Sequence, residues 1–136
     1  MPSITKITIA DGQATPANHD FNPYTAQRGS EPAVWLNKEA STMVGARRIT
    51  ISVREKSTGG YKVIAKIEDP VLAEVAANCC VDANTPKVSY TDLANIEFSL
   101  PAGSTIANRK DILAYAKNLL GHAVMSAAVV DLEPQF

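Results

Sequence analysis

Residues 47–68 alternate between apolar and polar side chains in a pattern that predicts two antiparallel strands. Ile49, Ile51 and Val53 recur at a spacing of two and therefore share one face. Residues 57–60, Ser-Thr-Gly-Gly, form the predicted turn, because such residues tolerate positive φ angles. Taken alone, this pattern indicates an antiparallel sheet with one solvated side. That side is polar and basic: Arg48, Thr50, Ser52 and Arg54 share it on the first strand, and Lys62, Ile64 and Lys66 share one face of the second.

Further strands are predicted on both sides of this pair. Pro70 is expected to end the second strand, because proline cannot donate to a β-ladder. A loop over residues 70–87 follows, and a loop of this length in a small domain is usually functional. The other predicted strands cover residues 4–10 and 17–23, as a hairpin around Asp11 and Gly12, then 32–38, and finally 88–101, where Leu93, Asn95, Glu97 and Ser99 alternate with Ala94, Ile96, Phe98 and Leu100.

After Pro101 the period changes to that of a helix. Ser104 or Thr105 can cap this helix, and Gly121 suits the C′ position after it. A second helix is predicted over residues 122–130. Strands followed by helices predict an α+β fold with the helices on one side of an antiparallel sheet. The first helix carries an apolar stripe, Ile112, Leu113, Ala116, Leu119 and Leu120.

The length of 136 residues, 46% of them hydrophobic, fits one domain spanning residues 1–136. Its parts are the hairpin (1–24), the main sheet with its long loop (32–101) and the helices (104–132). No run of about 18 apolar residues and no signal segment is present, so we expect a soluble protein without a membrane partner, made in a reducing cytosol.

Catalysis and metal binding have little support in the sequence. His19 and His122 are isolated and no Cys-x-x-Cys spacing occurs, so no metal site and no cofactor are expected. His19 next to Asp20 has no nucleophile placed to use it, which favours chance adjacency. Gly59 and Gly60 join two strands and open no helix, so they do not form a phosphate loop.

Charge is distributed unevenly along the chain. The net charge of −1 argues against a uniformly basic nucleic-acid binder. Between residues 47 and 66, however, the sequence has six of the thirteen basic residues and only one acidic residue, Glu55. This imbalance predicts a local positive patch. The six are Arg47, Arg48, Arg54, Lys56, Lys62 and Lys66.

The predicted layout leaves an open sheet edge and a sheet face that two short helices cover poorly. Exposed edges and half-covered apolar faces are normally paired or buried. A homodimer with a continuous sheet would satisfy both requirements.

At this point the chain resembles the coat proteins of single-stranded RNA bacteriophages, the levivirus group. The resemblance rests on the order and spacing of segments along nearly the whole chain, not on any single motif. The segments are ATPANHDFNP (14–23), RRITISVR (47–54), GGYKVIAKIEDP (59–70), PKVSYTDLANIEFSLP (86–101), STIANRKDILAYAKNLL (104–120) and the terminal LEPQF.

The resemblance implies an N-terminal β-hairpin, a five-stranded antiparallel sheet and two C-terminal helices. Two subunits would join their sheets into one of ten strands, with each subunit's helices lying across the partner. Such homodimers would build an icosahedral shell of T=3 symmetry, enclose viral RNA and bind an RNA hairpin that acts as a translational operator. The protein would then be structural, reside in the virion and assemble in the cytoplasm of a bacterial host.

Carried onto this sequence, the resemblance assigns RNA binding to the inner sheet face. Basic residues would contact phosphates, Thr50, Ser52 and Asn95 would bond to unpaired bases, and Glu97 would orient a basic partner. Leu93 lacks the stacking surface of the tyrosine that some relatives carry there. Tyr61 and Tyr90 have the opposite strand parity and are assigned to the core, while Trp35, Leu113, Leu119 and Leu120 are assigned to packing. The predicted RNA-binding residues are Arg48, Thr50, Ser52, Arg54, Lys62, Ile64, Lys66, Leu93, Asn95 and Glu97.

Two alternatives stay open. Cys79 and Cys80 occupy the loop through which some relatives link neighbouring subunits by disulfides, and either such bonds or two reduced thiols fit the sequence. The chain could also be a dimeric single-stranded RNA-binding regulatory module that never forms a shell. Electron microscopy of the purified protein separates that module from a coat protein.

Overall fold

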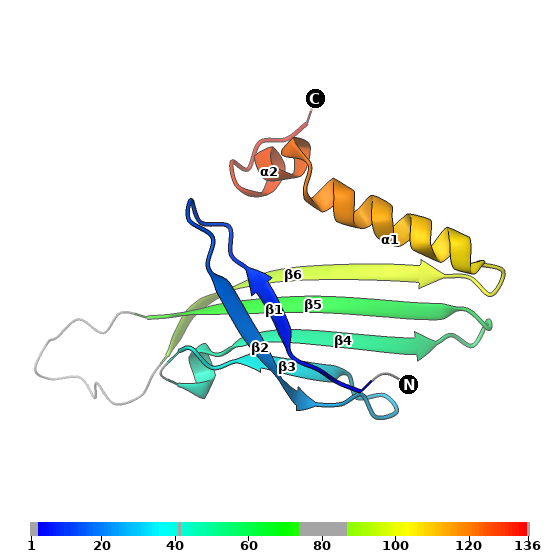
Figure 1. The fold of residues 1–136 in the computed structure, drawn as a ribbon, viewed down its shortest axis with the longest axis horizontal. Coiled ribbons are helices and arrows are strands. Elements are labelled where there is room, and N and C mark those ends of the chain that lie inside the picture. Colours follow the sequence, from blue (N-terminus) through cyan, green and yellow to red (C-terminus); the bar gives the residue numbers. More distant parts are fainter. Residues whose placement is uncertain (1–2, 41, 74–86, 136) are drawn as a thin grey trace, which may run out of the picture.

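The computed structural model describes residues 3–40, 42–73 and 87–135, and it has the predicted order of strands followed by helices (Figure 1). The strands form one antiparallel sheet in chain order, β1-β2-β3-β4-β5-β6. The α+β class is therefore confirmed. The elements are β1 (Ile7–Ala10), β2 (Asn18–Thr25), β3 (Ala33–Asn37), the 3₁₀ turn η1 (Met43–Gly45), β4 (Arg47–Glu55), β5 (Tyr61–Leu72), β6 (Val88–Leu100), α1 (Ile106–Leu120) and α2 (Ala123–Val129).

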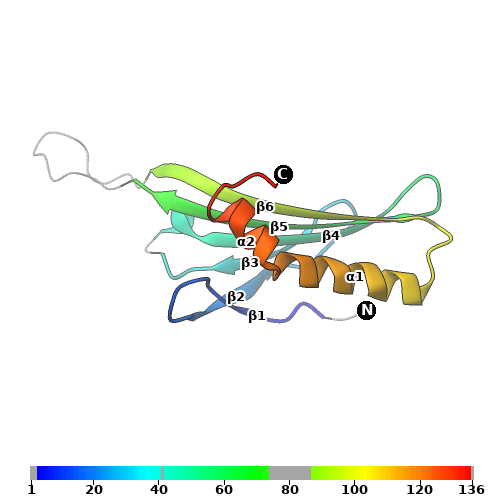
Figure 2. The same cartoon turned by 90° about the horizontal axis from the view of Figure 1, so that it is seen from above.

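The N-terminal hairpin is continuous with the main sheet. β1 pairs with β2 through residues such as Ile7 and Phe21, and the other edge of β2 pairs with β3 through an irregular register. β2 therefore belongs both to the hairpin and to a five-stranded sheet, β2 to β6. The hairpin turn is closed by Asp11, whose carboxylate accepts the N–H groups of Gln13 and Ala17. Figure 2 shows the hairpin and α1 on the same side of β4, β5 and β6.

The core lies between the hairpin and β3–β4. Phe21, Trp35 and Ile49 are the buried members of this cluster, and Ile7 and Ile51 pack against it half-buried. The Trp35 indole Nε1 donates to the Thr5 carbonyl at 2.7 Å, which satisfies its polar group as burial requires. The predicted packing role of Trp35 is confirmed. Because Ile49 and Ile51 contact the hairpin, the polar and basic side of β4 points away from it.

The β4–β5 turn depends on two glycines for different reasons. Gly59 has φ +83° and donates its N–H to the Lys56 carbonyl at 2.9 Å, so it occupies the left-handed region predicted for this turn. Gly60 has no such φ angle. A Cβ at position 60 would lie 2.5 Å from the Leu100 carbonyl oxygen and 3.1 Å from Pro101 Cα, so glycine allows the turn to touch the β6–α1 connection.

The expectation that Pro70 ends its strand is wrong. β5 continues to Leu72, and Pro70 pairs with Thr91 of β6. The β4 ladder ends at the pair Arg48 and Glu68, so beyond that point β5 has a neighbour on one side only and a residue without an N–H is tolerated. The predicted loop is correspondingly shorter. Cys79 and Cys80 lie outside the described residues.

The helices are capped as the sequence suggests, but they pack differently. Thr105 Oγ1 accepts the Asn108 N–H at 3.2 Å, which makes Thr105 the N-cap of α1. Gly121 ends this helix at φ −87°, so it is not the left-handed C′ glycine that was predicted. Leu113, Leu119 and Leu120 are more than half exposed, and the prediction that they pack is wrong within one chain. Figure 1 shows the reason, because α1 extends away from the sheet beyond β6.

Within the described residues, no single helix is long and apolar enough to cross a membrane. Only α1 and α2 taken together, with a 60° bend between them, would do so by length and composition.

Candidate nucleic-acid interface

The strand register places all ten predicted RNA-binding residues on one face of β4, β5 and β6. Residues paired across antiparallel strands project to the same side, so each row of pairs can be read across the sheet. We call this surface the basic face. Its rows are Arg48, Glu68 and Leu93; Thr50, Lys66 and Asn95; Ser52, Ile64 and Glu97; and Arg54, Lys62 and Ser99.

Several cations of the basic face have partners within the chain. Lys62 Nζ lies 3.0 Å from a Glu97 carboxylate oxygen, and Lys66 Nζ lies 2.7 Å from one of Glu68. Arg54 Nη2 donates to the Ser30 carbonyl at 2.6 Å. The lysine side chains stay 40% exposed, so they remain accessible to a ligand. Glu97 contacts a lysine as expected for a residue that orients a basic partner.

Glu68 and Ser99 also belong to this face but were not among the predicted RNA-binding residues, and Arg47 was counted in the positive patch although it lies elsewhere. Glu68 has the same parity as Lys62 and Lys66, so counting by two along β5 would have found it. Arg47 lies on the opposite side, because its Nε contacts Asp69 at 2.9 Å and its Nη1 contacts Glu39 at 3.4 Å. The positive patch is therefore smaller than composition suggested.

Burial divides the basic face into a floor and exposed positions. Ser52 is only 6% exposed, and Thr50 and Ile64 are half-buried. Leu93 is 58% exposed and offers an aliphatic surface without an aromatic ring. The positions most accessible to a ligand are therefore those on β6 and the long basic side chains.

Tyr61 and Tyr90 lie on the opposite face, as their parity predicted. They are 45% and 58% exposed, so their assignment to the core is wrong within one chain. The physical reason is that the buried cluster under the hairpin consists of residues from β2, β3 and β4, while α1 lies beyond β6 in Figure 1, so neither element buries these two tyrosines.

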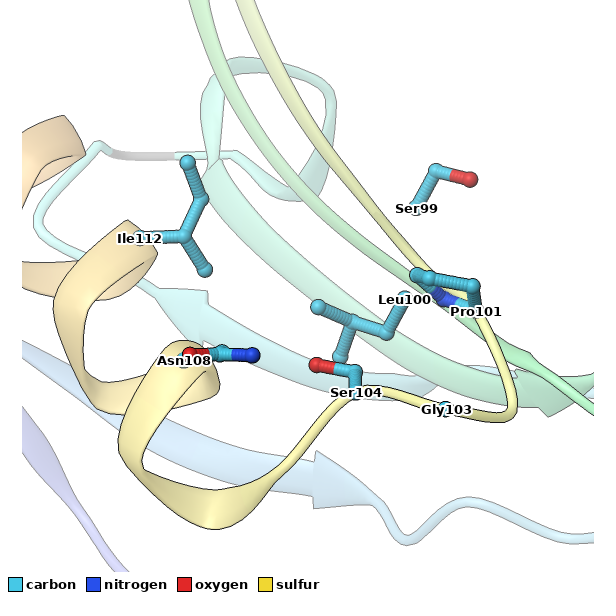
Figure 3. A pocket seen from close by; sticks show the side chains of 7 residues that line it. All are labelled: Ser99, Leu100, Pro101, Gly103, Ser104, Asn108 and Ile112. Carbon is cyan, nitrogen blue, oxygen red and sulfur yellow. The ribbon is translucent and has the colours of Figure 1, made fainter.

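A groove separates the end of β6 from α1 (Figure 3). Leu100 points toward α1 while Ser99 points away from it, in keeping with their alternation along the strand. The groove has a volume of about 330 Å³ next to Ser104 and Asn108. It continues into a larger and mainly apolar cavity of about 620 Å³, lined by Ile96, Phe98, Leu100, Ile112, Tyr115 and Leu119 among others.

His19 connects the hairpin to the main sheet. Its Nε2 lies 3.0 Å from an Asp11 carboxylate oxygen and its Nδ1 lies 2.6 Å from one of Glu39. These contacts, that with Asp11 first, raise the pKa of His19, and they lower the pKa of Asp11. Asp20 instead bonds to Thr8 and Lys6, so the two neighbours His19 and Asp20 do not act together.

No cluster of three or more His, Cys, Asp or Glu side chains suited to a metal ion occurs in the part of the chain that the structure describes.

A sequence model of the levivirus coat protein family matches residues 2–136. The chain belongs to the levivirus coat protein family.

Individual relatives agree with this assignment. The capsid protein of Pseudomonas phage PRR1 is 28% identical over 117 residues, which are 86% of this chain and 85% of that protein. A solved virus-like particle of bacteriophage NT-214 matches with a TM-score of 0.93 and 51% identity over 99% of this chain and 100% of that one. A virus-like particle of bacteriophage ESE058 gives a TM-score of 0.91 at 28% identity, with coverage of 99% and 100%.

These findings confirm that this levivirus coat protein is a structural protein of the virion and not an enzyme. In a structural protein, the carboxylate partners of His19 are readily understood as packing contacts. Its contacts hold two parts of a structural domain together.

Proposed function

We propose that this coat protein forms homodimers that assemble into an icosahedral shell and bind viral RNA on the basic face. One observation carries the proposal, namely that the sheet has two unlike sides. The hairpin and α1 lie on one side (Figure 2), and the strand register puts mainly basic and polar residues on the other. A shell protein needs such a division, because one side faces solvent and the other faces the genome.

We expect dimers because β6 has an open edge and the leucines of α1 are exposed. β6 pairs with β5 along one edge and, among the described residues, has no strand on its other edge. A long open edge is normally paired. The leucines of α1 are exposed beside the apolar cavity next to β6. A second copy would extend the sheet through its own β6, giving ten strands from two five-stranded sheets, and would lie beneath these leucines.

RNA contact follows from the chemistry of the basic face. Arg48, Arg54, Lys62 and Lys66 would neutralise phosphates and release counterions, which gives salt-sensitive affinity without sequence preference. Thr50 and Asn95, in the same row as Lys66, would bond to unpaired bases. Recognition of an operator hairpin would depend on these polar groups and on aliphatic contact with Leu93.

Relatives described as virus-like particles support the assembly of a shell. We extend the proposal to T=3 symmetry and to assembly in the host cytoplasm. Electron microscopy of the purified protein tests it directly. Closed particles support the shell, whereas dimers that persist at high concentration with added RNA would favour the regulatory module. Disulfide rings through Cys79 and Cys80 would appear on a non-reducing gel as five- and six-subunit species, and monomer alone would exclude them.

The RNA site is tested by Lys62→Ala and Arg54→Ala. Each variant should weaken binding of a labelled single-stranded RNA several-fold at low salt, and each should flatten the slope of log affinity against log salt by about 0.7, because one phosphate contact is lost. Lys110→Ala on α1 removes the same charge away from the basic face and should leave both quantities unchanged. Unaltered affinity and slope in the Lys62 and Arg54 variants, with intact dimers, would place the RNA elsewhere.

A further inference from the structure

The basic face contains two carboxylates that touch its lysines. Glu97 contacts Lys62 and Glu68 contacts Lys66, at 3.0 and 2.7 Å. Glu68 lies on β5 between Arg48 and Leu93 in its row, whereas Glu97 lies next to Ile64 on the edge strand β6. An RNA lying on this face would meet both.

Stability does not explain these pairs. Their side chains are 27–47% exposed, and ion pairs at such exposure contribute little to folding. The two carboxylates have a larger effect on the net charge of the basic face than on folding stability. The cations of this face are Arg48, Arg54, Lys62, Lys66 and also Lys56, whose ammonium group donates to Ser99. The two carboxylates therefore lower the charge of the basic face from +5 to +3.

The carboxylates compete with phosphate for the same ammonium groups. A phosphate that approaches Lys62 or Lys66 must displace or share the carboxylate, so part of the electrostatic gain of RNA binding is lost. Hydrogen bonds from Thr50 and Asn95 to bases carry no such penalty. The balance of binding free energy therefore moves from phosphate contacts toward base contacts.

Building on the proposed RNA-binding role, we propose that Glu68 and Glu97 are specificity-determining residues that restrain sequence-independent RNA binding. They hold the two lysines in place in the free protein and set the strength of the phosphate contribution. Glu68 acts through Lys66, which stands between Thr50 and Asn95, and Glu97 acts through Lys62, which stands between Arg54 and Ser99.

The test compares Glu68→Gln, Glu97→Gln and Glu55→Gln in the full-length protein. Glu55 lies on β4 but faces the other side of the sheet, paired with Tyr61, so its variant changes the total charge equally without altering the basic face. The probe is a labelled oligouridylate titrated at several potassium chloride concentrations. Thermal unfolding of each variant checks that the fold is retained.

Glu68→Gln and Glu97→Gln should each bind the oligouridylate about two- to fivefold more tightly at low salt. Each should also steepen the salt slope by about 0.7, because one more phosphate contact is made. Glu55→Gln should match the unmodified protein.

If all three glutamine variants behave alike, the restraining role is wrong. The Lys62→Ala variant keeps that outcome separate from the RNA site itself. A loss of affinity in Lys62→Ala alongside silent glutamine variants overturns only the role of the carboxylates, whereas a silent Lys62→Ala overturns the RNA site as well.

Discussion

The two halves of this coat protein differ in how completely they bury their own apolar residues. In the N-terminal half, Phe21, Trp35 and Ile49 are 4–9% exposed beneath the hairpin. In the C-terminal half, β6 and both helices hold no residue as buried as these, and the leucines of α1 are more than half exposed. One half completes its core within the chain, and the other presents surfaces that a second chain would cover.

The largest effect is expected from Trp35→Ala. Removing this indole leaves a cavity in the self-contained half and should lower the free energy of unfolding by about 3–5 kcal/mol. Tyr24→Ala, on β2 and 64% exposed, is the matched control and should change stability by less than about 0.5 kcal/mol. Denaturant unfolding measures both, and equal effects would mean that the hairpin does not enclose a core.

A smaller and different effect is expected from the double variant Leu113→Ser, Leu119→Ser. Because these side chains are exposed in one chain, their loss should spare the N-terminal core and weaken dimerisation by about 2–4 kcal/mol. Sedimentation equilibrium measures the association. Asn118→Ser, at an exposed position on the opposite side of the same helix, serves as control. A double variant that dimerises normally would show that α1 is not covered by a partner.

The smallest effect concerns the link between hairpin and sheet through His19. Because the pKa of His19 is raised by Asp11 and Glu39, its stabilising effect is complete below the unfolded value of about 6.5 and is lost as pH rises through the folded value. The lowered pKa values of Asp11 and Glu39 make their contribution complete above about 4 and remove it at more acidic pH. The link is therefore strongest between these limits.

His19→Gln should accordingly lower the thermal midpoint most between about pH 4.5 and 6.5 and least at alkaline pH. His122→Asn retains a capping group at the start of α2 and should show no such profile. A difference between His19→Gln and the unmodified protein that is constant with pH would mean that the imidazole acts by packing alone.

Local patterns predicted the strands and helices well, because alternation and capping residues act over a few positions. β4, the turn at Gly59 and the Thr105 cap are determined by neighbouring residues. Pro70 was misjudged because its tolerance depends on where the neighbouring strand ends, and that is a property of the whole sheet. The leucines of α1 were misjudged for a related reason, since periodicity identifies an apolar stripe but not the chain that covers it.

In the candidate site, too, some features follow from local patterns and others depend on the whole sheet. Parity along each strand placed the ten residues on one face, and the register brought the three strands together as expected. Ion pairs were harder to predict. The Glu68 contact with Lys66 joins residues i and i+2, which periodicity already implied, whereas Arg47 has the parity of Ile49 and meets Asp69 on the opposite face. Counting charged residues along the chain does not show which of them lie on the basic face and which pair elsewhere.

Gly60 allows the β4–β5 turn to lie close to the segment that leads into α1. A Cβ at this position would collide with the Leu100 carbonyl oxygen and approach Pro101 Cα, only a few residues before the helix begins. α1 has 15 residues and is therefore about 22 Å long. A tilt of about 10° at the first turn of α1 would therefore move its far end by about 4 Å. A side chain at position 60 would have to displace the segment that leads into α1, and in the proposed dimer such a shift would change how two subunits align.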